Sequence, residues 1–157
     1  MEIDWYTGPR THLRPLFELA EDSQQQLDRY INLGRVLLAR NGRRILGHLQ
    51  LVPTVGSRQI ELKSLAVVES RRRTGVGRAL VQAALEHCRG EAAHRLLVST
   101  AAADIGNLRF YQRLGFRMVR IERDVFGAEA GYADGIVING IPLRDRVWLD
   151  LDLSGES

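Results

Sequence analysis

The order of apolar and polar residues predicts alternating strands and helices along the chain. A period of two, or a short apolar run, marks strands at residues 2–6, 36–40, 43–52, 60–68, 94–99, 117–125 and 147–153. Apolar residues three or four apart mark helices that begin at Thr11 and Ser23, and further helices at 76–90 and 107–114. The Asn41-Gly42 pair predicts a hairpin between the second and third strands. This order of elements predicts an α/β fold.

The stretch at 62–85 is a strand, a turn and a helix in direct succession. The first N–H groups of a helix lack intrahelical acceptors and lie at the positive end of the helix dipole, so they suit a phosphate. Gly75 and Gly77 carry no Cβ to keep a phosphate away. Four cationic donors belong to the same turn: Arg71, Arg72, Arg73 and Arg78. The stretch therefore predicts an anion cradle. It has neither the third glycine of a dinucleotide fingerprint nor the Gly-Lys-Ser/Thr ending of a Walker A loop.

Two motifs resemble those of the GNAT acyltransferase superfamily. Arg72-x-x-Gly75-x-Gly77 after a strand resembles motif A, and the segment 110–116 resembles motif B, in which a short helix carries a tyrosine and ends in Gly-Phe. The motifs come in the family's order and at about its spacing. The resemblance implies an N-acetyltransferase that uses acetyl-CoA. It also implies a mixed, mostly antiparallel sheet of six to seven strands flanked by about four helices, as one domain over residues 1–157.

The same resemblance implies a set of acetyl-CoA contacts. The cradle would hold the pyrophosphate, and the preceding strand would pair its backbone with the pantetheine arm, provided that it separates from its parallel neighbour at 94–99. The family often keeps an asparagine seven residues before the motif B tyrosine, where this chain has Asp104. Asn107, about one helical turn later, either supplies that amide or is only a helix cap. The expected cofactor-binding residues are Leu65, Ala66, Val67, Arg72, Arg73, Thr74, Gly75, Val76, Gly77, Arg78 and Asn107.

Acyl transfer from a thioester to an amine also needs a base, an oxyanion contact and an acid for the leaving sulfur. Tyr111 matches the tyrosine that many relatives use as the acid, with an ordinary core tyrosine as the alternative. Glu61 lies eleven residues before Arg72, where some relatives keep a general base. Its alternative is a structural carboxylate paired with Lys63. The resemblance assigns the oxyanion contact to the Leu65 N–H.

Composition limits the other ligands. The net charge is +3 and Lys63 is the only lysine, so the arginine excess suits phosphate-bearing ligands. The four histidines are dispersed and Cys88 is the only cysteine, so we expect no metal. No apolar run is long enough for a membrane span or a signal peptide. We expect a cytoplasmic protein that contacts neither membrane nor nucleic acid.

The sequence leaves the identity of the acyl acceptor open. Four acidic residues lie between and within the first two expected helices: Glu18, Glu21, Asp22 and Asp28. In proteins that resemble this one the region borders the acceptor site, which favours a cationic amine on a small molecule or a protein; a solvated acidic face is the alternative. A non-catalytic acyl-CoA sensor or assembly module is a second hypothesis for function, and nucleic-acid binding through the arginine run is a third. An exposed final strand at 147–153 would allow a homodimer.

Overall fold

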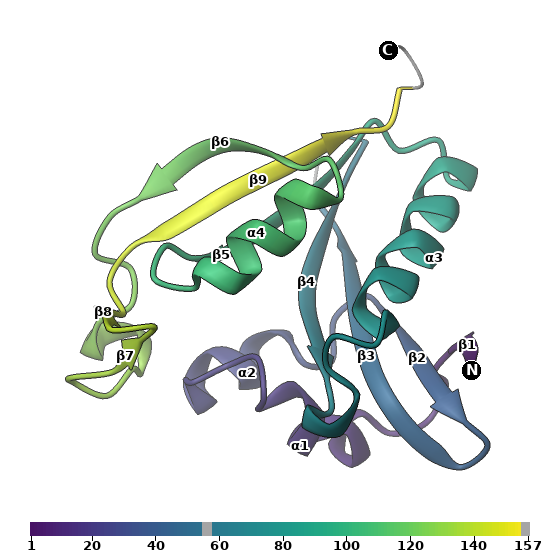
Figure 1. Ribbon diagram of the computed structural model, residues 1–157, viewed down its shortest axis with the longest axis horizontal. Coiled ribbons are helices and arrows are strands. Elements are labelled where there is room, and N and C mark those ends of the chain that lie inside the picture. The colour runs from purple at the N-terminus through teal and green to yellow at the C-terminus, as the bar shows by residue number, and fades with distance from the viewer. Residues whose placement is uncertain (55–57, 155–157) are drawn as a thin grey trace.

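The computed structural model describes residues 1–54 and 58–154, which form a seven-stranded sheet in the order β1-β2-β3-β4-β5-β9-β6 (Figure 1). Its strands are β1 (Glu2–Trp5), β2 (Arg35–Asn41), β3 (Arg44–Pro53), β4 (Gln59–Val67), β5 (Arg95–Ala101), β6 (Arg117–Glu122) and β9 (Arg146–Asp152). Among the described residues, every neighbouring pair is antiparallel except β4 and β5. The expected mixed, mostly antiparallel sheet is therefore confirmed. In the connection between β6 and β9, β7 (Val137–Ile138) pairs with β8 (Ile141–Pro142).

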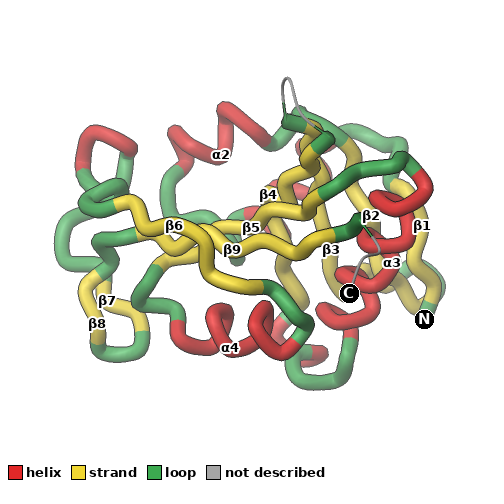
Figure 2. Tube along the Cα trace, turned by 90° about the horizontal axis from the view of Figure 1, so that it is seen from above, coloured by secondary structure: helices red, strands yellow, loops and turns green. Residues whose placement is uncertain are grey.

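Helices cover both faces of the sheet. The α-helices of the described residues are α1 (Arg14–Phe17), α2 (Gln24–Tyr30), α3 (Val76–Gly90) and α4 (Ile105–Arg113). Figure 2 shows α2 on one side of the sheet and α3 and α4 on the other. The larger apolar cluster, which includes Leu49 and Leu80, lies under α3 and α4. A smaller cluster around Phe17 and Leu27 lies under α1 and α2. None of these helices is long and apolar enough to cross a membrane.

The parallel strands β4 and β5 separate at their carboxyl ends (Figure 1). They pair from Gln59–Arg95 to Leu62–Val98 and no further, although β4 continues to Val67 and β5 to Ala101. On its other edge β4 stays paired with β3 from Ile60 to Val67, apart from the bulge residue Lys63. The separation on which the acetyl-CoA prediction depends is therefore present. It leaves one edge of β4 without a neighbouring strand.

A β-bulge in β4 changes which side chains share a face. In the pairing with β3, Lys63 is an extra residue between Leu62 and Ser64. Leu62 and Leu65 consequently pack into the same cluster on the α3 side, although three positions separate them. Ala66 packs into the cluster under α1 and α2. Ser64, two positions before Ala66, faces that same side.

Some expected elements differ in the structure. The helix expected from Thr11 is a 3-10 turn at Arg10–Leu13 followed by the short α1, because Pro15 has no N–H and fits only a first helical turn. The strand expected to reach residue 125 ends at Glu122. The prediction of an exposed final strand is wrong, since β9 pairs with β5 on one side and β6 on the other. The edge strands of the sheet are β1 and β6.

Candidate active site

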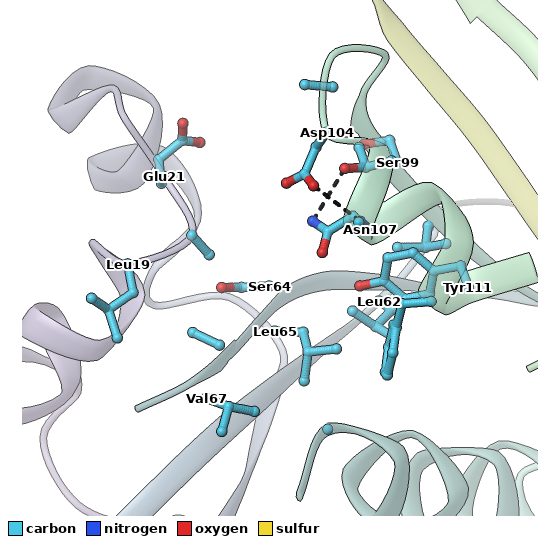
Figure 3. Close-up of a pocket in the computed structure, with 18 of the residues that line it drawn as sticks. Leu19, Glu21, Leu62, Ser64, Leu65, Val67, Ser99, Asp104, Asn107 and Tyr111 are labelled. Carbon is cyan, nitrogen blue, oxygen red and sulfur yellow. Dashed lines mark hydrogen bonds between the residues drawn. The ribbon is translucent and has the colours of Figure 1, made fainter. Parts of the chain in front are cut away.

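A cleft of about 780 Å³ opens where β4 and β5 separate. Its walls come from these two strands, the turn before α3, α4, the connection between α1 and α2, and the segment 126–146. Figure 3 shows Glu21 on one side of the cleft and Asn107 and Tyr111 on the other. Ser64 and its neighbour Leu65 lie between them on β4. Segments far apart in the sequence therefore meet around one space.

The arginine-rich turn forms one end of the cleft. Gly75 has a φ of +91°, in the left-handed region that favours glycine, and no atom lies within 4 Å of where a Cβ would be. The first bond of α3 runs from the Ala79 N–H to the Gly75 carbonyl at 3.0 Å. The three N–H groups before Ala79 therefore have no intrahelical acceptor. The turn has the open backbone geometry that a phosphate needs.

Most residues predicted for the cradle line the cleft. They are Arg72, Arg73, Gly75, Gly77 and Arg78, together with Arg71. The side chains of Thr74 and Val76 do not line it. The Thr74 hydroxyl donates to the Arg71 carbonyl at 2.5 Å, and Val76 is buried in the core. Val76 can therefore meet a ligand only through its backbone, and the Thr74 hydroxyl has its hydrogen engaged by the Arg71 carbonyl. Arg72 Nε donates to the Val67 carbonyl at 3.2 Å, which ties the turn to the end of β4.

The backbone of β4 alternates between β3 and the cleft. The Val68 N–H donates to the Leu46 carbonyl of β3 at 2.9 Å. Because hydrogen-bonded pairs alternate along an antiparallel ladder, Ala66, two residues earlier, also bonds to β3. Leu65 and Val67 turn their N–H groups to the other side, into the gap. Of the three residues expected to pair with pantetheine, Ala66 is thus engaged by β3, whereas Leu65 and Val67 have N–H groups available.

Tyr111 is held on α4 by aromatic neighbours. Its ring meets those of Phe110 and Phe116 edge-on, with ring centres 5.1 and 5.5 Å away. Its hydroxyl points into the cleft toward β4 (Figure 3). Burial, and secondarily the Asp104 carboxylate, raises the pKa of the Tyr111 phenol. The phenol therefore keeps its proton at neutral pH and has a proton to donate.

Asn107 lies one turn before Tyr111 on the same helix. The N-cap of α4 is Asp104, whose Oδ1 accepts the Asn107 N–H at 3.0 Å. The alternative that Asn107 is only a helix cap is therefore wrong. Asn107 Nδ2 donates to Thr100 Oγ1 at 3.3 Å, and its carbonyl oxygen faces the cleft (Figure 3). The side chain is available to accept a hydrogen bond from a ligand.

Glu61 lies outside the part of the cleft wall that the described residues form. Its Oε2 is 3.7 Å from Lys63 Nζ, as the alternation along β4 predicted. Lys63 itself lines the cleft, and its Nζ lies 4.9 Å from the centre of the Tyr30 ring. This geometry supports the structural alternative for Glu61. Its role as a general base stays a prediction.

Glu21 organises the other end of the cleft. The hydroxyl of Tyr132 donates to Glu21 Oε2 at 2.6 Å, and that of Tyr30 donates to Oε1 at 3.1 Å. Burial first, and then the Glu21 carboxylate, raises the pKa of both phenols, so both remain donors. The sequence indicated Glu21 only as one of four acidic residues. No sequence signal pointed to Tyr132, which lies 111 residues away.

Ser64 and His48 form a second pair that the sequence did not reveal. Ser64 lines the cleft, and its Oγ is 2.8 Å from Nε2 of His48, which is fully buried on β3. A regular alternation would put Ser64 on the same side of β4 as Leu62, whereas the bulge at Lys63 puts it on the opposite side, and no local pattern announces that bulge. The part of the chain that the structure describes contains no group of three or more His, Cys, Asp or Glu residues able to hold a metal.

Comparisons with known proteins agree with this geometry. Residues 3–116 match the acetyltransferase (GNAT) family. An uncharacterized N-acetyltransferase of Bacillus subtilis, YvbK, is 34% identical over 141 residues, covering 90% of this chain and 89% of that protein. A Bacillus subtilis acetyltransferase solved with CoA is 32% identical, with a TM-score of 0.86 over 96% of this chain and 97% of that chain.

Two further structures extend the likeness. A GNAT family acetyltransferase from Elizabethkingia anophelis with acetyl-CoA bound is 28% identical, with a TM-score of 0.86 over 97% of both chains. An IAA acetyltransferase from Bacillus cereus is 29% identical, with a TM-score of 0.85 over 97% of this chain and 100% of that chain. Since the family match spans most of the chain and CoA-bound relatives share its fold, this protein belongs to the acetyltransferase (GNAT) family and is an acetyl-CoA-dependent N-acetyltransferase.

Proposed function

We propose that the protein transfers the acetyl group directly from acetyl-CoA to a cationic primary amine while both are bound in the cleft. One arrangement carries this proposal: the Leu65 N–H, which the ladder with β3 leaves free, and the Tyr111 hydroxyl face the same gap. The Glu21 carboxylate lies across it (Figure 3). The cleft therefore has an oxyanion donor, an acid and an anionic wall around one space. No covalent enzyme intermediate is needed.

The acetyl-CoA end is formed by the turn and β4. The arginines of the turn and the free amides at the start of α3 bind the pyrophosphate. Leu65 and Val67 bind the pantetheine arm through their backbone, and Asn107 binds it through its side-chain oxygen. Acetyl-CoA supplies the activated acetyl thioester.

At the reacting centre an N–C bond forms and the C–S bond breaks. The Leu65 N–H donates to the carbonyl oxygen as that oxygen gains negative charge. Tyr111 gives its proton to the departing sulfur, because its buried phenol remains protonated. Both groups belong to rigid elements, β4 and α4, so their positions are set before the substrates bind.

The acceptor end combines charge with apolar surface. Glu21 and Asp22 provide two carboxylates, which attract an ammonium group. The same end is lined by apolar side chains: Leu19, Phe126, Ile138 and Leu143. This combination favours a primary amine that carries an apolar body.

Two carboxylates are candidates for the base that deprotonates the amine. Glu61 has the position that the family resemblance indicates, but it is paired with Lys63. Glu21 lines the cleft directly and keeps lone pairs beyond the two phenol contacts. Separate replacement of Glu61 and Glu21 by glutamine tests which of the two carboxylates acts as the base.

The experiment measures thiol release from acetyl-CoA with a panel of primary amines: 2-phenylethylamine, hexylamine, ethanolamine and spermidine. We expect the amines with an apolar body to have the highest kcat/KM. Glu21→Gln should raise the amine KM about tenfold or more, because a charged hydrogen bond is lost. The KM for acetyl-CoA should stay unchanged. If Glu61 is the base, Glu61→Gln should lower kcat by about 10²–10⁴.

Glu18→Gln is the matched control. Glu18 is exposed, accepts a hydrogen bond from Gln24 and lies outside the cleft wall, so its amide variant should behave as the wild type. Equal amine KM values for Glu21→Gln and Glu18→Gln would contradict the assignment of Glu21 to the acceptor end of the cleft. Binding of acetyl-CoA at one site per chain without acetylation of any amine would favour a non-catalytic sensor.

A further inference from the structure

Ser64 stands beside the expected oxyanion donor, on the acceptor side of β4. It immediately precedes Leu65, and the bulge at Lys63 puts its side chain, like that of Ala66, on the side of the sheet that α1 and α2 cover. Figure 3 shows its hydroxyl oxygen pointing toward the side of the cleft where Glu21 lies. An amine that attacks an acetyl group held at the Leu65 N–H approaches from this side. The hydroxyl is therefore placed next to the attacking nitrogen.

His48 supports this hydroxyl from behind. It is fully buried, with Nε2 2.8 Å from Ser64 Oγ and its ring stacked on Phe17 at 4.1 Å between centres. Burial lowers the pKa of His48 to about 3, so the imidazole is neutral at physiological pH. The ring is fixed in place and does not gain a proton during turnover.

The hydrogen on His48 is assigned from its surroundings. Nδ1 is buried and has no hydrogen-bond partner among the described residues. Since a buried N–H without an acceptor is less tolerated than an unpaired lone pair, we assign the hydrogen to Nε2, which then donates to Ser64 Oγ. No other hydrogen bond to Ser64 Oγ exists among the described residues. Ser64 therefore keeps one lone pair and its own hydrogen for a ligand.

We propose that Ser64 is a catalytic residue whose Oγ accepts an N–H of the acceptor amine and thereby directs the nitrogen lone pair at the acetyl carbon. His48 is the positioning residue that fixes the Ser64 hydroxyl from β3. The proposal rests on the proposed function, because it concerns the amine in the same cleft. It gives a role to a buried imidazole that stacks on Phe17 in the cluster under α1 and α2.

The pair moves no proton in this scheme. The N–C bond forms and the C–S bond breaks, and the sulfur receives its proton from Tyr111. The surplus proton of the nitrogen leaves to a carboxylate at the acceptor end or to water. Ser64 and His48 stay neutral throughout, since the buried imidazole does not ionise.

The kinetic test uses the panel amine with the highest kcat/KM. Ser64→Ala should lower kcat/KM for that amine about tenfold, the effect of one hydrogen bond, with the calorimetric Kd for acetyl-CoA unchanged. His48→Leu should cause a similar fall, and the double variant should fall no further, because the two residues act as one unit. His48→Gln, whose amide nitrogen can donate from a similar place, should regain most of the activity. Additive losses in the double variant would overturn the proposal.

A second measurement does not depend on the acceptor. Nitrogen-15 NMR of histidine-labelled wild type at pH 7 should show a neutral His48 with its hydrogen on Nε2, and Ser64→Ala should shift the Nε2 resonance. A hydrogen on Nδ1, or a His48 that titrates between pH 5 and 8, would overturn the assigned role. Failure of the wild type to acetylate any amine would count against the proposed function, while this spectrum still decides whether His48 holds Ser64.

Discussion

At the scale of single residues, burial decides which groups in the cleft carry a proton. Tyr111 is almost fully buried, and its pKa is raised. An acid is active while it is protonated, so a raised pKa moves the loss of this acid to higher pH. We therefore expect the profile of kcat/KM above pH 7 to show no alkaline fall caused by Tyr111 below pH 10.

Removal of the Tyr111 hydroxyl tests its role as the acid. Tyr111→Phe keeps the aromatic contacts with Phe110 and Phe116 and removes only the donor. We expect kcat to fall by about 10²–10⁴, measured as thiol release at saturating amine. Tyr6→Phe is the control, since Tyr6 donates to the Pro9 carbonyl outside the cleft. Unchanged turnover of Tyr111→Phe would remove this residue from the chemistry.

His48 should make the protein sensitive to acid. Its pKa is about 3 in the folded protein, against about 6.5 in an unfolded chain. The unfolded state therefore binds an extra proton below pH 6.5, and stability is lost as the pH falls from there toward 3. Between pH 7 and 4.5 this amounts to about 2–3 kcal/mol. Urea denaturation should show a shallower pH dependence in this range for His48→Gln; identical slopes would contradict the lowered pKa.

At the scale of elements, the segment between β6 and β9 is fastened to α2 and closes the acceptor end. Ser23 Oγ donates to the Ala130 carbonyl at 2.7 Å, and Gln26 Nε2 donates to the same carbonyl at 3.3 Å. Tyr132 then reaches Glu21. The connection and α2 therefore position the acceptor end jointly.

Gly131, in the connection between β6 and β9, lies in close contact with the start of α2. A Cβ at this position would lie 2.6 Å from Ser23 Oγ and 2.9 Å from Gln25 Cβ. Gly131→Ala should therefore push the connection off α2, withdraw Tyr132 from Glu21 and raise the amine KM severalfold, with acetyl-CoA affinity kept. Gly135→Ala shares the positive φ but meets no atom within 4 Å. Gly135→Ala should lower the free energy of unfolding by about 1–2 kcal/mol and leave the amine KM unchanged. Equal amine KM values for the two variants would contradict the closing role of this contact.

Elements with local signals were predictable, and contacts between distant elements were not. The glycine turn before α3 and the aromatic frame of Tyr111 depend on residues a few positions apart, so their spacing identified them. The β4 bulge depends on the register with β3, and it places Ser64 and Ala66 on the side of β4 opposite Leu62. Similarly, β9 is an internal strand because of the order of strands in the sheet, which the pattern of residues within β9 does not reveal.

At the scale of the whole molecule, the fold brings two binding ends to one gap in its sheet. The acetyl-CoA end is formed by the turn before α3 together with β4 and α4, and the acceptor end by the connection after α1 and the segment before β9. Both ends open into the same cleft (Figure 3). This arrangement allows both substrates to be bound at once, which is the central claim of the proposed mechanism.

The most direct test of that claim is the initial-velocity pattern of wild-type protein, with acetyl-CoA varied at several fixed concentrations of the best panel amine. Direct transfer in a ternary complex predicts double-reciprocal lines that intersect, because both substrates must be bound before CoA is released. Parallel lines, with CoA release before the amine binds, would indicate a covalent acetyl-enzyme and contradict the account.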